Sequence, residues 1–200
     1  MVTKDRIIAV WLQREFDRNW RHIRPIAECR CPNLNRNQIR QIIFNPNYDD
    51  VNENFLRFQF FQFRYPLLRP VCNGNWTEIT MDEDTFRELR VIAKDTSWIN
   101  LSNNTGRLST VAENVSNRNP IENLTTETRN IIETINTIST GEIDTRFFLI
   151  KSNDSEIVTI LEGNKNAVAL YINCFLTENR EYEPITVFMG NLDEKSFWQW

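Results

Sequence analysis

The fold is decided by one stretch of the chain, Ile157-Val158-Thr159-Ile160-Leu161-Glu162-Gly163-Asn164-Lys165-Asn166-Ala167-Val168-Ala169-Leu170. Its first part is apolar and rich in β-branched residues, which predicts a buried strand over 156–161. Glycine and polar residues then break the apolar pattern over 162–166. An apolar run over 167–172 follows and predicts a helix. The stretch therefore predicts a strand that passes through a glycine turn into a helix.

The segments on either side extend this pattern. Isoleucines recur at helical spacing over 131–138, and Gly141 is placed to follow the end of that helix. Apolar runs predict strands over 146–150 and 184–190, and an alternating pattern predicts another over 76–81. These elements indicate an α/β (α+β) fold, with a small mixed sheet, flanking helices and a helical N-terminal extension.

Residues 1–70 are predicted to form the extension, packed on an α/β domain of residues 71–200 as a single compact unit. Apolar spacing predicts a helix over 4–24, and we expect Pro25 either to end it or to start the next turn. A shorter helix is predicted over 35–44.

The segment 51–68 interleaves aromatic residues with arginine and glutamine. Its spacing fits either a buried helix or an alternating strand. We favour the helix, because Asn52 can cap it and Glu53 falls in its first turn. Aromatic residues with arginines also suit a base-stacking surface, but a core helix with outward-facing arginines is the preferred interpretation.

Between the two parts, the acidic group Asp82-Glu83-Asp84 predicts the start of a helix that runs to Ile92. Residues 95–120 are polar and are predicted to be a loop, with Trp98 and Leu101 as anchors and a turn over 103–107.

Amino-acid composition argues against several classes of function. The 200 residues include 23 Lys and Arg against 27 Asp and Glu, a net charge of −4. This balance disfavours non-specific nucleic-acid binding, which requires a basic face. No apolar run matches a membrane span or the core of a signal peptide, so we expect a cytoplasmic protein without membrane association. Four cysteines and the single His22 do not form a metal-binding pattern.

The glycine turn is also the best candidate for a binding site. A helix start offers unpaired backbone N–H groups and the positive end of the helix dipole, which together favour anions. Lys165 would add positive charge, and Asn164 and Asn166 would donate hydrogen bonds. Glu162 would hold a metal ion or act as a base. A single glycine between a strand and a helix also serves as a plain connection.

The C-terminal half resembles the ParB/sulfiredoxin superfamily. The resemblance rests on the helix that begins at Ile131, on the strand over 147–150, and on the strand, acidic-Gly box and alanine-containing helix over 157–170. Upstream, the segment Trp98-Ile99-Asn100-Leu101-Ser102, with Thr105 and Arg107, is similar to a "W-x-x-L-S-x-x-T-R" region of small ParB-like bacterial proteins.

The resemblance implies nucleotide chemistry: a nucleoside triphosphate bound with Mg²⁺, and hydrolysis or phosphoryl transfer at the box. It implies Glu162 as the catalytic group. The implied ligand-binding residues are Gly163, Asn164, Lys165, Asn166, Thr105 and Arg107. The sequence departs from the family pattern, because the box arginine falls on Asn166 and the usual histidine on Asn164. Phosphoryl transfer would then need Lys165 or Arg107 as its cationic group.

The alternative is a non-catalytic interaction protein, of an immunity or anti-defence type, that kept the fold. It would use an aromatic surface to bind a protein partner or a second copy of the chain. The aromatic C-terminus supplies candidate residues for this surface, namely Phe197, Trp198 and Trp200.

Overall fold

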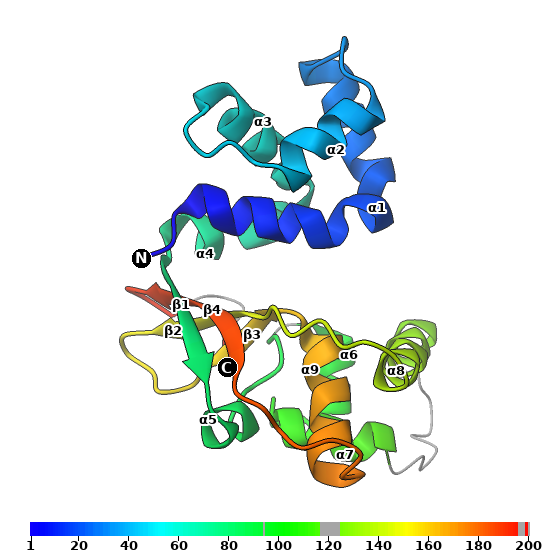
Figure 1. Ribbon diagram of the computed structural model, residues 1–200. Coiled ribbons are helices and arrows are strands. Elements are labelled where there is room, and N and C mark those ends of the chain that lie inside the picture. Colours follow the sequence, from blue (N-terminus) through cyan, green and yellow to red (C-terminus); the bar gives the residue numbers. More distant parts are fainter. Residues whose placement is uncertain (94, 117–124, 196–198, 200) are drawn as a thin grey trace. The chain divides into compact units, whose positions relative to one another are not determined.

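The computed structural model describes residues 1–93, 95–116, 125–195 and 199, and it comprises two compact units, Met1–Trp76 and Thr77–Trp200 (Figure 1). The first unit is built from helices, and the second combines helices with a mixed sheet. The protein therefore has the mixed α+β architecture that the sequence predicts. The aromatic residues Phe197, Trp198 and Trp200 lie outside the described residues.

The first unit consists of helices, and the apolar face of α1 is buried among them. Its elements are α1 (Lys4–Arg30), α2 (Arg36–Phe44), α3 (Val51–Phe61), the short 3-10 helix η1 (Gln62–Arg64) and α4 (Tyr65–Asn73). α1 packs against α3, where the rings of Trp11 and Phe61 meet edge to face with centroids 5.4 Å apart. The preference for helix over strand in 51–68 is confirmed.

Of the two alternatives for Pro25, an end of the helix is excluded, because α1 continues through Pro25 to Arg30. The backbone leaves helical geometry earlier, at Asn19 (φ −112°, ψ 16°), and then resumes it. Ile23 and Ala27 on either side of the proline are both buried. Their packing holds the helix together across a residue that lacks an N–H donor.

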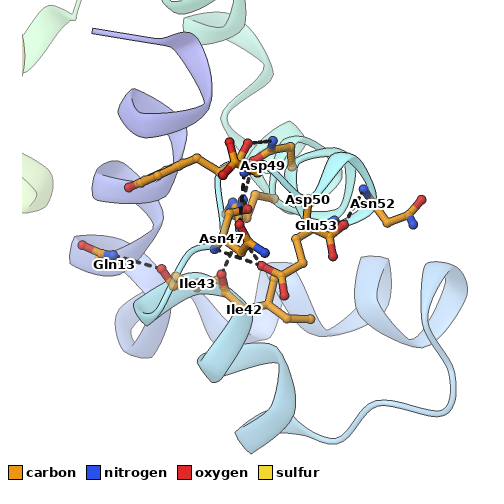
Figure 2. A network of polar contacts seen from close by, with 11 residues as sticks. Gln13, Ile42, Ile43, Asn47, Asp49, Asp50, Asn52 and Glu53 are labelled. Carbon is orange, nitrogen blue, oxygen red and sulfur yellow. Dashed lines mark hydrogen bonds and ion pairs between the residues drawn. The ribbon is translucent and has the colours of Figure 1, made fainter.

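A network of polar contacts fixes the connection between α2 and α3 (Figure 2). Asp50, rather than the predicted Asn52, caps α3, and its Oδ1 accepts the N–H groups of Asn52 and Glu53. The Arg57 side chain is buried and donates to the carbonyls of Ile42 and Asn47 at 2.9 and 3.0 Å. The loop is therefore held by a charged side chain inside the unit.

The second unit is organised around a four-stranded sheet of order β1-β4-β2-β3. Its strands are β1 (Asn75–Met81), β2 (Phe148–Ser152), β3 (Thr159–Glu162) and β4 (Ile185–Leu192). β2 pairs antiparallel with β3 and parallel with β4, with Phe148 opposite Phe188. All four strands fall on segments for which the sequence predicts strands.

Helices cover one face of this sheet. They are α5 (Glu83–Arg87), α6 (Thr96–Leu101), α7 (Leu108–Ser116), α8 (Thr126–Ser139), α9 (Asn164–Tyr171) and the π-helix η2 (Ile172–Leu176). α9 contacts both α8 and α7 (Figure 1). Its residues Val168 and Leu170 share a core with Leu149 and Ile160 of the sheet. The helix after the glycine turn is thus anchored on the strands that precede it.

Two predictions about 82–120 are wrong. The helix that begins at Glu83 ends at Arg87 instead of Ile92, because the chain turns extended and buries Leu89 and Val91. The predicted loop over 95–120 contains α6 and α7. Asp95 caps α6, and α7 carries a buried apolar stripe at helical spacing, formed by Leu108, Val111, Ala112 and Val115.

Within the residues that the structure describes, no helix is both long enough and apolar enough to cross a membrane.

Candidate phosphate-binding site

The glycine turn leads into a helix start at which both Gly163 and Asn164 are buried. Gly163 is the N-cap of α9 and has φ 102° and ψ 10°, in the left-handed region that favours glycine. Its carbonyl accepts the N–H of Ala167 at 2.9 Å. No side chain caps the first turn of the helix. The backbone amides at this end are therefore presented without a capping side chain, which suits an anion.

An extended segment lies beside β3 and widens the sheet. Arg90 bridges to Thr159 in parallel and to Arg107 in antiparallel fashion. Backbone hydrogen bonds support both bridges: the Arg90 N–H donates to Val158 at 3.0 Å, and the Val91 N–H donates to Gly106 at 2.8 Å. Because bridged residues share a face of a sheet, Arg90 and Arg107 lie side by side.

The same segment is tied to the helix start. Oδ1 of Asn164, the first residue of α9, accepts the N–H of Ile92 at 2.9 Å, and its Nδ2 donates to the Ile160 carbonyl at 3.2 Å. The segment runs parallel to β3, so its end and the glycine turn lie at the same edge of the sheet. Thr105, which precedes the strand partner Gly106, reaches this edge as well.

Charged side chains of both signs, Arg90, Arg107 and Glu88, lie along this extended segment. Nη1 of Arg90 donates to the Thr105 carbonyl at 2.7 Å, which aims the guanidinium toward the edge. Burial and the like charge of Arg107 lower the pKa of Arg90, and Glu88 opposes this effect. The two guanidinium groups are thus close enough to repel each other, and a bound anion would relieve that repulsion.

Several of the residues that the sequence singles out have structural roles, and the contact that links the Arg90 segment to the glycine turn is the one between Ile92 and Asn164. Asn164 is buried in the contacts just described, and Oδ1 of Asn166 accepts the N–H of Asp144 at 3.2 Å. The Thr105 hydroxyl donates to the Ser102 carbonyl at 2.6 Å and accepts the Arg107 N–H. These contacts leave the backbone amides and the arginines as the main groups for a ligand.

Glu162 and Lys165 flank the glycine turn, and both are partly buried. Among the residues that the structure describes, no three histidine, cysteine or acidic side chains cluster as a metal site.

Sequence reasoning missed Arg90, because it placed this residue in a helix. The pattern that reveals it is the alternation over 89–91, where buried Leu89 and Val91 flank a half-exposed arginine. Such alternation is typical of a strand. The preceding acidic residues and arginines are equally compatible with a helix, and they concealed the change of structure after Arg87.

Comparison of the chain with family models, with curated proteins and with solved structures finds no match.

Proposed function

We propose that the second unit binds a phosphate-bearing ligand, and specifically a nucleotide, at the carboxyl edge of β3. The observation that carries the proposal is the hydrogen bond from the Ile92 N–H to Asn164, which joins the arginine-bearing segment to the uncapped start of α9. Amides of a helix start and a pair of guanidinium groups are complementary to a polyphosphate. The resemblance to the ParB/sulfiredoxin superfamily supports a nucleotide over a simple anion.

The proposed site requires a glycine at position 163. With φ 102°, Gly163 adopts a left-handed backbone conformation that a residue with a side chain rarely adopts. Arg107 is exposed and Arg90 is partly buried, so the two would contact different oxygens of an extended ligand. Bidentate contacts from guanidinium groups give such a site geometric specificity.

The test is a thermal-shift screen of ATP, CTP and GTP, their diphosphates and inorganic phosphate, with and without Mg²⁺. A ligand at 100 times its Kd stabilises a folded protein by about 2.7 kcal/mol. We expect a shift for at least one nucleotide and a smaller one for phosphate. Gly163→Val should abolish the shift, and Arg90→Gln and Arg107→Gln should each weaken binding about tenfold.

Arg129→Gln is the matched control, because Arg129 is an exposed arginine on α8 of the same unit. It should bind like the unaltered protein. A shift that survives both Arg90→Gln and Arg107→Gln, or no shift with any compound, would contradict the proposal. Release of phosphate from the bound nucleotide that is lost in Glu162→Gln while binding persists would extend the proposal to hydrolysis.

A second candidate function, protein interaction, is favoured by exposed apolar side chains at the start of α3. Tyr48, Val51 and Phe55 have relative exposures of 40, 78 and 54%. Val51 and Phe55 are four residues apart and therefore share a helix face. The acidic side chains beside them are Asp49, Asp50 and Glu53. This combination is complementary to an amphipathic partner segment that carries basic residues.

This candidate is tested with two synthetic amphipathic helical peptides that share their apolar positions and differ only in lysine or glutamate flanks. We expect the lysine peptide to bind at least tenfold more tightly at low salt, and Phe55→Ser to weaken it about tenfold. Leu176→Ser, which removes an exposed apolar side chain of the other unit, is the control. Equal binding of the two peptides would exclude a basic partner.

A further inference from the structure

The corner between α1 and α2 forms a partly open cavity of about 440 Å³ that the proposed nucleotide site does not involve. The second half of α1 forms one wall and the first turn of α2 forms the other, with the loop over 32–34 between them. A volume of this size lies within the range of small-molecule binding sites.

The sequence explains why the corner is open. α1 bends at Asn19, and the chain reverses after Arg30 into the capping box formed by Asn35 and Gln38. Ala27 of α1 and Ile39 of α2 are both buried and both line the cavity. Since alanine is small, the two helices leave space where a larger side chain would fill the corner.

The lining combines buried apolar residues with exposed charged ones, which are Arg24, Arg36 and Glu28. Ala27 and Ile39 are buried, Trp20 and Leu34 are partly buried, and Arg24 and Arg36 are exposed. This distribution separates an apolar body from a charged end, as amphipathic ligands do.

The arginines at the rim are held in place. Arg36 lies over the rings of Phe16 and Trp20, at 5.7 and 5.3 Å from their centroids, and its Nη2 donates to Asp17 at 2.8 Å. Nε of Arg24 donates to Glu28 at 2.7 Å. Exposed ion pairs of this kind contribute little stability, and each guanidinium has further N–H donors, so an added anion can share or replace these partners.

We propose that this cavity binds a small organic anion with an aromatic or alicyclic body and one carboxylate or sulfonate. The body would occupy the space beside Trp20 and Ala27, and the acidic group would pair with Arg24 and Arg36. Inorganic phosphate would gain nothing from the apolar interior, and an uncharged ring would leave the arginines without a new partner. The ligand therefore needs both an apolar body and an acidic group.

The test uses 1-anilinonaphthalene-8-sulfonate, whose fluorescence rises in apolar sites, with uncharged N-phenyl-1-naphthylamine as the comparison. We expect saturable binding of the sulfonate at one site and binding of the uncharged compound at least tenfold weaker. Arg36→Gln and Arg24→Gln should each weaken the sulfonate about tenfold. Ala27→Phe should abolish its binding by filling the cavity.

Two controls separate this cavity from other surfaces. Arg40→Gln removes another exposed arginine of α2, and Phe55→Ser removes an exposed apolar side chain of the same unit; both should bind normally. Far-UV circular dichroism verifies the fold of each variant. If Ala27→Phe does not fold, the exposed Arg36→Gln decides the question. Binding that persists in a folded Ala27→Phe or Arg36→Gln, or that is lost in Phe55→Ser, overturns the proposal.

Discussion

The two units contain the same short motif in different surroundings. Glu53 and Arg57 on α3, and Glu83 and Arg87 on α5, are both pairs four residues apart, with N···O distances of 3.1 and 2.7 Å. The Arg57 side chain is 1% exposed, whereas that of Arg87 is 42% exposed. The two ion pairs have the same spacing along a helix. They differ in burial, and the buried Arg57 also holds the loop before α3 in place.

Burial also changes what each arginine contacts. Arg57 donates to two backbone carbonyls of the preceding connection, whereas Arg87 covers the ring of Phe175 with its guanidinium 3.8 Å from the centroid. The first unit thus fixes a loop through a buried charge. The second unit joins its extended segments through backbone bridges at Arg90 and through the Asn164 amide.

The largest effect is expected from removing the buried charge. Arg57→Met should destabilise the first unit by about 3–5 kcal/mol, because the carbonyls of Ile42 and Asn47 and the Glu53 carboxylate lose a buried charged partner. Amide hydrogen exchange measures this effect unit by unit. Exchange should accelerate in α2 and α3 and stay unchanged in the sheet of the second unit. A loss below about 1 kcal/mol would show that burial does not distinguish the two pairs.

The second unit has its own buried polar anchor in Asn164. Asn164→Ala removes the acceptor of the Ile92 N–H and the donor to the Ile160 carbonyl, so we expect a loss of about 2 kcal/mol. Faster exchange of the Val91 and Ile92 amides would locate the loss in the extended segment. Asn166→Ala is the control, because its Oδ1 accepts a single hydrogen bond, at 3.2 Å, and it should cost less.

The contrast between the units explains which features could be predicted from the sequence. The strand, glycine turn and helix over 157–170 follow from local pattern, and so do α2 and α3 of the first unit, whereas α4 is not predicted. The burial of Arg57 and the extended state of Arg90 do not, because both depend on partners distant along the chain. Arg57 meets carbonyls 10 and 15 residues away, and Arg90 pairs with Thr159. Local spacing at these positions is equally compatible with an exposed helix face.

A smaller, pH-dependent effect is expected at Tyr182 of the second unit, whose hydroxyl donates to the Met81 carbonyl at 3.1 Å. Burial, together with Asp82, Cys174 and Glu83, raises the pKa of Tyr182. Its contribution is therefore complete below the unfolded pKa of about 10 and is lost as the pH rises toward the folded value.

Urea unfolding between pH 7 and 11 checks this expectation. Tyr182→Phe should cost about 1 kcal/mol at pH 7 and should decline less steeply than the unaltered protein above about pH 10. Parallel curves for the two proteins would show that the hydroxyl titrates alike in the folded and unfolded states.

The smallest effect is expected at the exposed pair, where Arg87→Met should cost about 1 kcal/mol or less. The exposed ion pair with Glu83 contributes a few tenths of this, and the contact with the Phe175 ring contributes the remainder. Glu83→Gln separates the two parts, since it removes the ion pair and keeps the ring contact. In 1 M salt, the part of the free-energy cost that comes from the lost ion pair should disappear for Arg87→Met and Glu83→Gln. The cost of Arg57→Met should stay unchanged, because salt screens exposed charges far better than buried ones. If Arg87→Met costs as much as Arg57→Met, the contact with the Phe175 ring stabilises the exposed arginine as strongly as burial stabilises Arg57. Burial would then not be what distinguishes the two pairs.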